Sequence, residues 1–535
     1  MKKLLVVGVL TVFLQGVGMA QSANKPNILF IAVDDLKPII GAYGNTFIKT
    51  PNLDRLASRG TTFLNNYCQQ AVCGPTRASI ITGMRPDYTK IWDLKTQIRT
   101  VSPDIVTMPQ YLITQGYSTQ GIGKVFDPRN VDANLDKQSW SVPYYKTDKK
   151  YYVPGMGEPA EGRYQDPETK LAVEKVIKEA LASGKTKAEA NEEAGIKIKP
   201  ATEGIDVPDN AYTDGANILQ AKDILGKLSK SDQPFFFAVG IAKPHLPFVA
   251  PKKYWDLYKR EDIVLAPFQD KITNSVDVSY HTAGELRAYT DMPADIAATP
   301  QKDFGLTLSA DKQKELIHGY YAAISYTDAL VGKLLDALDS LELSKNTIVV
   351  LWGDHGWHLG DHNLWCKHSN FEEATHAPLF ISGPGIKSNK TKSFSEHVDV
   401  FPTICDLAGV PIPAQLQGKS LKPVMINPES AVKEYAVSQY PRSSAAEEKN
   451  RLGYADANVM GYSIRDKQYR YTIWMRNSFR STMPFNPASV IGDELYDYKA
   501  DPLEKHNAAK DKNYEAITAK YKKEMLRYFE SQLKK

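Results

Sequence analysis

Five short apolar runs, each passing into polar residues, constrain the fold of this chain more than any other feature. The runs are PNILFIAV (26–33), YSTQGIG (117–123), PFFFAVGIA (234–242), NTIVVLW (346–352) and APLFIS (377–382). Short apolar runs that alternate with helical segments are typical of buried strands in a parallel sheet. The clearest helical segment is amphipathic and covers residues 315–343. The pattern predicts an α/β fold, with a mostly parallel sheet sandwiched by helices.

The polar residues that follow four of these runs predict one shared site. They are Asp34 and Asp35, then Lys124, then Lys243 and His245, and finally Asp354 and His355. Any one of these groups is equally well explained as a turn or a helix cap. In open α/β sheets, however, ligands bind beyond the carboxyl ends of the strands. We therefore expect these four segments to converge on a binding site.

The remaining periodicity suggests an insertion and a second, smaller domain. The charged stretch 170–195, within the interval from Asp127 to Asp214, has the pattern of a solvated helical pair inserted between strands. Beyond residue 440 the chain predicts a strand pair at 461–475 and a final helix at 513–533. We expect a main domain over residues 21–440 and a C-terminal α+β subdomain over residues 441–535.

Residues 1–20 resemble a cleavable secretory signal. Lys2 and Lys3 precede an apolar run from Leu4 to Leu14, and small residues end the segment at Ala20. The run is short for a membrane span, so we expect an exported protein, periplasmic or secreted, without a stable membrane anchor. The formal net charge of +4 over 535 residues is mild and gives no reason to expect nucleic-acid binding.

CGPTRASIITG, at residues 73–83, resembles the sulfatase signature C-x-P-S/T-R followed by T-G. The likeness continues, in order and spacing, through further segments of the chain: DDLKPIIGAYG, GKVF, KPHLPF, GDHGWHLGDHNLWCKHSNFEEATHAPL, SQYPR, GYSIRDKQYRYTIW and ELYDYKADPLEKHN. Together they resemble the type I (formylglycine) sulfatase family, and most of all its branch that acts on 2-O-sulfated iduronate. The resemblance implies an alkaline-phosphatase-like fold.

The resemblance also implies a nucleophile and a metal. In this family a maturation enzyme oxidises the signature cysteine, here Cys73, to formylglycine. One hydroxyl of the hydrated aldehyde attacks sulfur, and the second allows the sulfate to be expelled. One Ca²⁺ is implied, because hard oxygen ligands suit that ion. Its ligands by resemblance are Asp34, Asp35, Asp354 and the modified Cys73, with His355 at a neighbouring family position.

Other residues match family positions around the sulfate. Arg77 and Lys124 match residues that hold the hydrated aldehyde, while Lys367 and His245 match residues that contact the sulfate. We expect His245 to donate the proton to the departing alcohol. Lys243 either reaches a substrate carboxylate or is an ordinary loop charge, since lysine binds anions without fixed geometry.

The predicted function is an exported, calcium-dependent sulfatase acting on a sulfated polysaccharide or its oligosaccharides. A 2-O-sulfated uronic acid at a chain end is the first choice of substrate. Asp127 stands where that branch of the family has a histidine, and an aspartate there would repel an anionic sugar or accept hydroxyl groups. The alternatives are a carrageenan- or fucan-type neutral-sugar sulfatase, a phosphate or phosphonate ester hydrolase of the same fold, and a catalytically dead glycan-binding scaffold.

Overall fold

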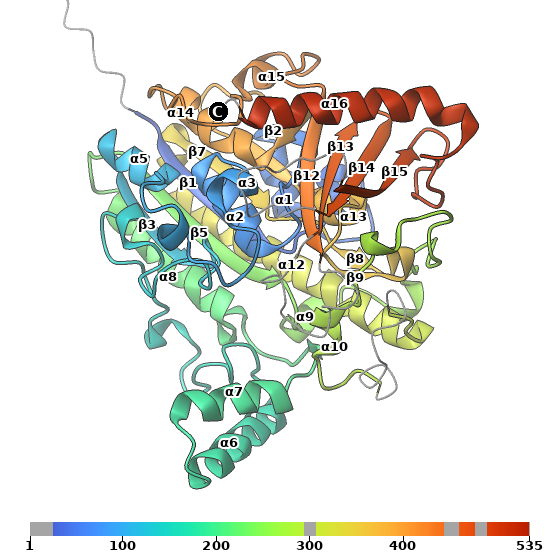
Figure 1. Ribbon diagram of the computed structural model, residues 1–535. Helices are drawn as coiled ribbons and strands as arrows, with labels where there is room; N and C mark the ends of the chain where they lie inside the picture. The colour runs from blue at the N-terminus through green and yellow to red at the C-terminus, as the bar shows by residue number, and fades with distance from the viewer. Residues whose placement is uncertain (1–24, 294–305, 443–458, 477–488, 534–535) are drawn as a thin grey trace, which may run out of the picture.

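A seven-stranded sheet forms the centre of the molecule, as the computed structural model shows for residues 25–293, 306–442, 459–476 and 489–533 (Figure 1). The proposed signal lies outside these residues. The strand order is β11-β2-β10-β7-β1-β5-β3. In that order the strands are Asn389–Glu396, Gly60–Tyr67, Leu379–Ser382, Thr347–Gly353, Asn27–Asp34, Phe235–Pro244 and Ser118–Gly123.

All five apolar runs form strands of this sheet, but one of them runs in the opposite direction. β7, β1, β5 and β3 are neighbours and pair in parallel, as expected. β10 pairs antiparallel with both β7 and β2. About 25 residues separate β7 from β10, and they include only short elements, β8 (His358–Leu359), β9 (Trp365–Cys366) and α13 (Glu372–Thr375). Without a crossover helix, the chain starts β10 at the edge where β7 ends and must run back.

Helices cover both faces of the sheet, which confirms the predicted sandwich. One apolar core lies between one face and α1 (Pro51–Ala57), α8 (Thr213–Leu228) and α12 (Ala310–Ser340). A second core lies between the other face and α2 (Cys73–Thr82), α5 (Met108–Thr114) and α14 (Val400–Leu407). Alternate residues of β1 enter the two cores, since successive side chains of a strand point to opposite faces.

The inserted helical pair lies away from the body of the molecule, as Figure 1 shows. It consists of α6 (Pro167–Ala182) and α7 (Lys187–Lys197), close to the predicted stretch. Side-chain caps start both helices, because Asp166 and Thr186 accept hydrogen bonds from backbone N–H groups of the first turn. The pair therefore has local reasons to be helical without burial in the main core.

The C-terminal part contains a four-stranded antiparallel sheet covered by one helix. Its strands are β12 (Tyr435–Arg442), β13 (Val459–Asp466), β14 (Tyr469–Arg476) and β15 (Val490–Asp497), and the helix is α16 (Glu515–Leu533). β12 begins before the predicted boundary at residue 440 and also contacts the main domain. Gln439 N donates to Gln69 O at 2.7 Å, and Ser438 Oγ donates to Cys68 O at 2.6 Å. The second sheet thereby holds the loop that precedes Cys73.

Among the described residues, no helix is long and apolar enough to cross a membrane.

Candidate active site

The carboxyl ends of β1, β3, β5 and β7 place their polar residues in one cluster, as the apolar runs predicted. Asp34 ends β1, and Asp35 follows it with a left-handed backbone (φ 58°). The backbone N–H of Asp35 donates to Oδ1 of Asp354, beyond β7, at 2.8 Å. Lys124 follows β3, whose Gly123 lies directly against Gly240 of β5. A Cβ on Gly123 would stand 2.0 Å from the carbonyl oxygen of Gly240. These glycines let the two strand ends approach closely enough to bring Lys124 into the cluster.

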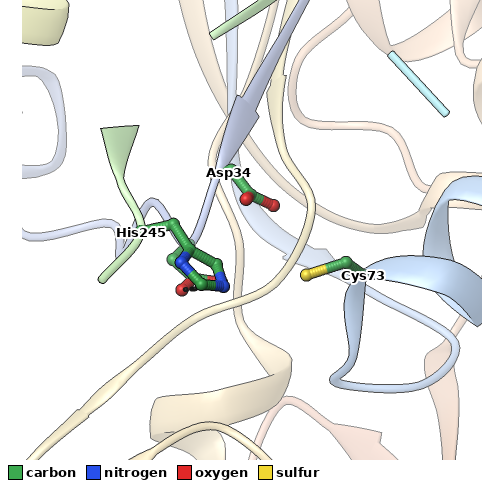
Figure 2. A group of neighbouring side chains, drawn as sticks. Asp34, Cys73 and His245 are labelled. Carbon is green, nitrogen blue, oxygen red and sulfur yellow. Dashed lines mark ion pairs between the residues drawn. The ribbon is translucent and has the colours of Figure 1, made fainter. Parts of the chain in front are cut away.

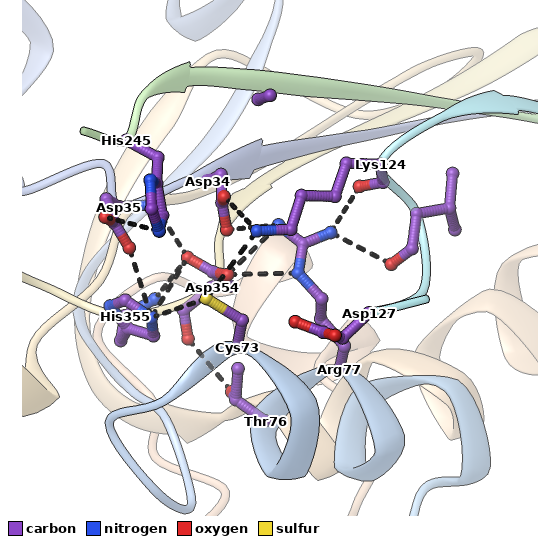
Figure 3. Close-up of polar contacts among 12 residues, drawn as sticks. Asp34, Asp35, Cys73, Thr76, Arg77, Lys124, Asp127, His245, Asp354 and His355 are labelled. Carbon is purple, nitrogen blue, oxygen red and sulfur yellow. Dashed lines mark hydrogen bonds and ion pairs between the residues drawn. The ribbon is translucent and has the colours of Figure 1, made fainter. Parts of the chain in front are cut away.

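Cys73 occupies the first turn of α2 and points into this cluster, as Figures 2 and 3 show. Its Sγ lies 3.6 Å from Nε2 of His355 and 3.8 Å from Nζ of Lys124. The side chain is buried, and burial, followed by the charge of Asp34, raises the pKa of the thiol well above its usual value. The unmodified thiol is therefore a poor nucleophile at neutral pH, because the thiolate is the reactive form.

Arg77, one turn further along α2, holds two of the carboxylates with its planar fork. Its Nε donates to Asp354 at 3.0 Å and its Nη2 donates to Asp34 at 2.9 Å, while Nη1 donates to the carbonyl of Val125 at 2.9 Å. Lys124 forms a further ion pair with Asp34. All of these carboxylates and the guanidinium are buried, so each charge needs its partners to offset its desolvation.

Three buried carboxylates, Asp34, Asp35 and Asp354, form the centre of the site. Burial by itself would raise the pKa of Asp34, but Lys124 and Arg77 outweigh it and hold that pKa well below its usual value. Burial raises the pKa of Asp354 to about 7, and the negative charge of Asp34 adds to the effect. Concentrated anionic oxygens of this kind are the donor set that Ca²⁺ prefers.

The donor atoms of this cluster are close enough together to hold one metal ion. One atom from each of Asp35, Cys73, Asp354 and His355 lies within 4.8 Å of the others, and the same holds for Asp34, Asp35, Cys73 and His245. Burial lowers the pKa of His355 to about 4, so the ring is neutral at about pH 7. Its Nδ1 lies 3.0 Å from the carbonyl of Gly356 and donates to it, which leaves Nε2 with a lone pair facing the cluster. The residues present therefore fit the calcium ligand set that the resemblance implies.

Lys367 and His245 both lie near the carboxylate of Asp35. A turn after β9 positions Lys367, and the end of β5 positions His245. Cys366 and His368, on either side of Lys367, both have left-handed backbones (φ 73° and 55°). Nζ of Lys367 is 3.0 Å from Oδ1 of Asp35, and Nε2 of His245 is 3.7 Å from Oδ2. Non-glycine residues rarely adopt such φ values, and when they do they cluster at functional sites.

Glu285 belongs to this cluster and was not predicted. It lies on the short helix α10 (Gly284–Arg287), and its carboxylate is 3.0 Å from His245 Nε2 and 3.2 Å from Lys367 Nζ. Burial would raise its pKa, but Lys367 and the hydrogen bond from His245 hold that pKa well below the usual value. No apolar run precedes Glu285, so the strand-end pattern that located the other residues could not indicate it.

Two further candidates, Lys243 and Asp127, border the site but use their charged groups within the protein. Nζ of Lys243 donates to the carbonyl oxygens of His245 and Pro247, the latter at 2.7 Å, and burial lowers its pKa to about 8. Both carboxylate oxygens of Asp127 accept hydrogen bonds from Arg129. Lys243 was predicted either to reach a substrate carboxylate or to be an ordinary loop charge, and Asp127 either to repel an anionic sugar or to accept hydroxyl groups. These roles stay predictions.

A cavity of about 2510 Å³ opens in front of this cluster. Its lining includes Cys73, Lys124 and His245, which belong to the cluster at the carboxyl edge of the sheet. The insertion supplies another part of the wall through Arg163, from the loop before α6, and Ile196 of α7. Pockets for single small ligands usually measure about 300–1,000 Å³, so this one has room for several sugar units.

Comparison with known proteins agrees with this geometry. The family profile described as Sulfatase matches residues 26–410, and the profile described as N-sulphoglucosamine sulphohydrolase, C-terminal, matches residues 360–531. Human iduronate 2-sulfatase is 33% identical over 545 residues, which cover 91% of each protein.

Solved structures share the fold at lower identity. The phosphonate monoester hydrolase of Agrobacterium radiobacter superposes with a TM-score of 0.66 at 21% identity, covering 95% of this chain and 96% of the other. A 2-O GAG sulfatase superposes with a TM-score of 0.61 at 22% identity, covering 95% of this chain and 92% of the other. The family profile spans most of the chain, and the human relative exceeds 30% identity along nearly its whole length. This chain belongs to the sulfatase family and is a sulfuric ester hydrolase.

Proposed function

We propose that this protein is an exported, calcium-dependent sulfatase that removes sulfate from a sulfated polysaccharide or its oligosaccharides, with Cys73 acting as formylglycine. The observation that carries the proposal is the position of Cys73. Its side chain lies among three buried carboxylates and three cations, the buried Arg77 and Lys367 and the partly buried Lys124, at the carboxyl edge of the sheet. The family resemblance supports the oxidation of Cys73, and the signal-like pattern of residues 1–20 supports export.

A hydrated formylglycine would supply an attacking hydroxyl and a second hydroxyl that allows the sulfate to leave, which a cysteine thiol cannot do. Around it, Lys124 lies 3.8 Å from the sulfur that the hydroxyls would replace, near enough to bind one of them. Nε2 of His355, at 3.6 Å with a free lone pair, is the group placed to accept a proton from a hydroxyl at this position.

Ca²⁺, held by Asp34, Asp35, Asp354 and the oxygens at residue 73, would supply positive charge that favours an anionic oxygen near neutral pH. Arg77 does not reach the cavity as a free cation, because its donors are taken by Asp34, Asp354 and backbone carbonyls. Its part is to orient two ligand carboxylates. Lys367 and His245, on the cavity side of Asp35, are the cations positioned to contact a sulfate.

His245 is the proton donor in this proposal. Its Nδ1 faces the carbonyl of Leu246 and its Nε2 faces the carboxylate of Glu285, and neither neighbour can donate a hydrogen bond. A ring with an acceptor at each nitrogen makes both hydrogen bonds only as the imidazolium. A protonated histidine at the mouth of the cluster is suited to protonate the sugar oxygen as the S–O bond breaks.

The substrate we propose is a 2-O-sulfated uronic acid at or near a chain end. Support comes from the human relative, which bears the name iduronate 2-sulfatase, and from the cavity wall contributed by the insertion. Galactan or fucan sulfate is the second candidate. Asp127, which favoured it, carries no free negative charge into the cavity once Arg129 is paired with it.

Phosphate or phosphonate ester hydrolysis is a further candidate, since a phosphonate monoester hydrolase has the same fold. That likeness extends to the fold alone. One experiment separates the candidates. The protein is expressed with a formylglycine-generating enzyme, the mass of the peptide containing residue 73 is measured, and release of sulfate and phosphate from matched aryl esters is compared. Sulfate release that depends on the aldehyde mass supports the proposal, whereas preferential phosphate release refutes it.

A further inference from the structure

Arg129 presents a half-exposed guanidinium to the cavity that contains Cys73. The side chain of Arg129 is 52% exposed, whereas that of Asp127, its partner, is fully buried. Both residues line the cavity, together with Lys124 and Cys73. Arg129 is thus a cation at the wall of the proposed active site that the strand-end pattern did not indicate.

Asp127 holds this guanidinium in one position. Nε of Arg129 donates to Oδ1 of Asp127 at 2.9 Å, and Nη2 donates to Oδ2 at 2.8 Å. The backbone N–H of Arg129 also donates to Oδ1, at 3.0 Å, which closes a tight turn over the carboxylate. Asn130 anchors the turn, because its Nδ2 donates to the carbonyls of Asp93 and Thr96 at 2.9 and 2.8 Å.

These contacts use only one edge of the guanidinium. The pair with Asp127 occupies Nε–H and one N–H of Nη2, and the opposite edge, formed by Nη1 and Nη2, retains donors. Among the described residues, Asp127 is the carboxylate that pairs with Arg129. Two parallel N–H donors match the oxygens of a carboxylate, and such bidentate pairs are stronger and more specific than a single contact.

The turn that contains Arg129 also lies against the first turn of α2, which contains Cys73, and both residues line the same cavity. Burial is the largest single influence and lowers the pKa of Arg129, but the hydrogen bond and the charge of Asp127 help to outweigh it and raise that pKa. Asn130, the next residue, packs against Gly74, the neighbour of Cys73. A Cβ on Gly74 would stand 1.9 Å from Oδ1 of Asn130. A sugar with its sulfate at residue 73 therefore brings its neighbouring substituents close to Arg129.

We propose that Arg129 binds the carboxylate of a uronic acid while the sulfate of the same saccharide lies at Cys73, and that Asp127 is the positioning residue for Arg129. The proposal rests on the proposed function and names the group that selects the substrate. Asp127 then has a role other than repelling anions: it consumes one edge of Arg129, fixes its orientation and leaves the other edge for the substrate.

The test uses two disaccharides that differ in a single group: a 2-O-sulfated uronate disaccharide and its carboxyl-reduced counterpart. Sulfate release is measured as kcat/KM for the mature wild type and for the variants R129Q, R129K, D127N and K146Q. Lys146 lines the same cavity and is exposed, so K146Q controls for the loss of one positive charge. A nitroaryl sulfate serves as a third substrate that carries no carboxylate.

We expect wild-type enzyme to prefer the uronate, and we expect R129Q to lower the uronate-to-reduced ratio of kcat/KM about ten- to hundredfold, the effect of losing a charge-assisted bond. R129K keeps the charge without the fork and should restore part of the ratio. D127N should raise KM for the uronate more than it lowers kcat. K146Q should leave the ratio unchanged.

An R129Q ratio within twofold of wild type would overturn the inference, as would turnover of the nitroaryl sulfate without turnover of either disaccharide. Failure to release sulfate from all three substrates by protein that contains formylglycine would instead refute the proposed function. The two failures are therefore distinguishable.

Discussion

Replacing Glu285 by glutamine should slow the hydrolysis of sugar sulfates much more than that of activated aryl sulfates. The carboxylate of Glu285 lies 3.0 Å from Nε2 of His245 and stabilises the imidazolium that we assign as proton donor. Glutamine keeps the size of the side chain but removes its charge. The change therefore acts on the protonated form of His245.

The expected magnitude follows from the kind of bond that is lost. A hydrogen bond between charged groups contributes about 1.5–3 kcal/mol, and about 1.4 kcal/mol corresponds to a tenfold change in rate. A lower kcat by roughly one to two orders of magnitude is expected for a sugar alcohol, which needs a proton in order to leave. A nitrophenolate leaves without one, so that substrate should lose much less.

The assay compares kcat of wild type and E285Q on a sugar sulfate and on aryl sulfates with leaving groups of graded acidity. E494Q is the matched control. Glu494 is also a buried carboxylate, and it accepts hydrogen bonds from Trp474 and Tyr496 in the C-terminal sheet, away from the cavity. An equal loss on every leaving group would refute the reasoning, because Glu285 would then support the fold or substrate binding and not protonation.

Three further predictions test the nucleophile, the metal and a buried group of ion pairs around Glu396, the last residue of β11. C73A should abolish sulfate release and change the free energy of unfolding by only about 1 kcal/mol, measured by denaturant titration; turnover by folded C73A would exclude the mechanism. Chelation should abolish activity and lower the melting temperature, and Ca²⁺ should restore both at one ion per chain, whereas two ions in elemental analysis would favour a phosphoesterase. E396Q should destabilise the protein by about 3–5 kcal/mol at neutral pH, because it removes the buried partner of Arg85 and Lys433. These cations outweigh burial and lower the pKa of Glu396, so its contribution to the free energy of unfolding is present above about pH 4 and is lost as the pH falls. The difference in stability between wild type and E396Q, measured by urea unfolding, should therefore shrink in acid. A difference that stays constant with pH would contradict this reasoning.

The residues that sequence analysis located share a simple physical reason. Asp34, Lys124, His245 and Asp354 follow apolar runs, and parallel neighbouring strands end at the same edge, so their convergence required no knowledge of tertiary contacts. Cys73 was recognised through its signature. The cluster that the structure shows contains all of these residues, while their chemical roles stay predictions.

What sequence analysis missed depends on pairings between distant or irregular segments. Glu285 lies on a four-residue helix in a stretch without periodicity, so only its contacts with His245 and Lys367 reveal it. The direction of β10 was not encoded in its apolar run, because a short buried run looks the same in either orientation. β2 and β11 were not predicted, since the runs GTTFLNNY and NKTKSFSE contain many polar residues.

Asp127 shows the limit most clearly. Considered alone, Asp127 was expected to repel an anionic sugar or to accept hydrogen bonds from hydroxyl groups. Beside Arg129, which folds back over it through a two-residue turn, the same carboxylate holds a cation in place. The sign of the local charge depended on a pairing that residue type alone did not indicate.

The contact between β12 and the loop before Cys73 restricts when Cys73 can be oxidised during synthesis and folding. Once Ser438 and Gln439 have bonded to Cys68 and Gln69, the folded protein leaves Cys73 only 1% exposed, and a modifying enzyme has no extended segment to bind. The oxidation proposed here must therefore come before this contact forms.

β12 is synthesised about 360 residues after Cys73. At about 5–20 residues per second, that delay gives the ribosome-bound chain roughly 20–70 s during which β12 cannot yet hold the loop before the cysteine. The order of the two segments along the chain thus keeps the future nucleophile accessible while it is still a thiol. A circular permutant that places β12 ahead of Cys73 would shorten this interval and should yield protein with less formylglycine.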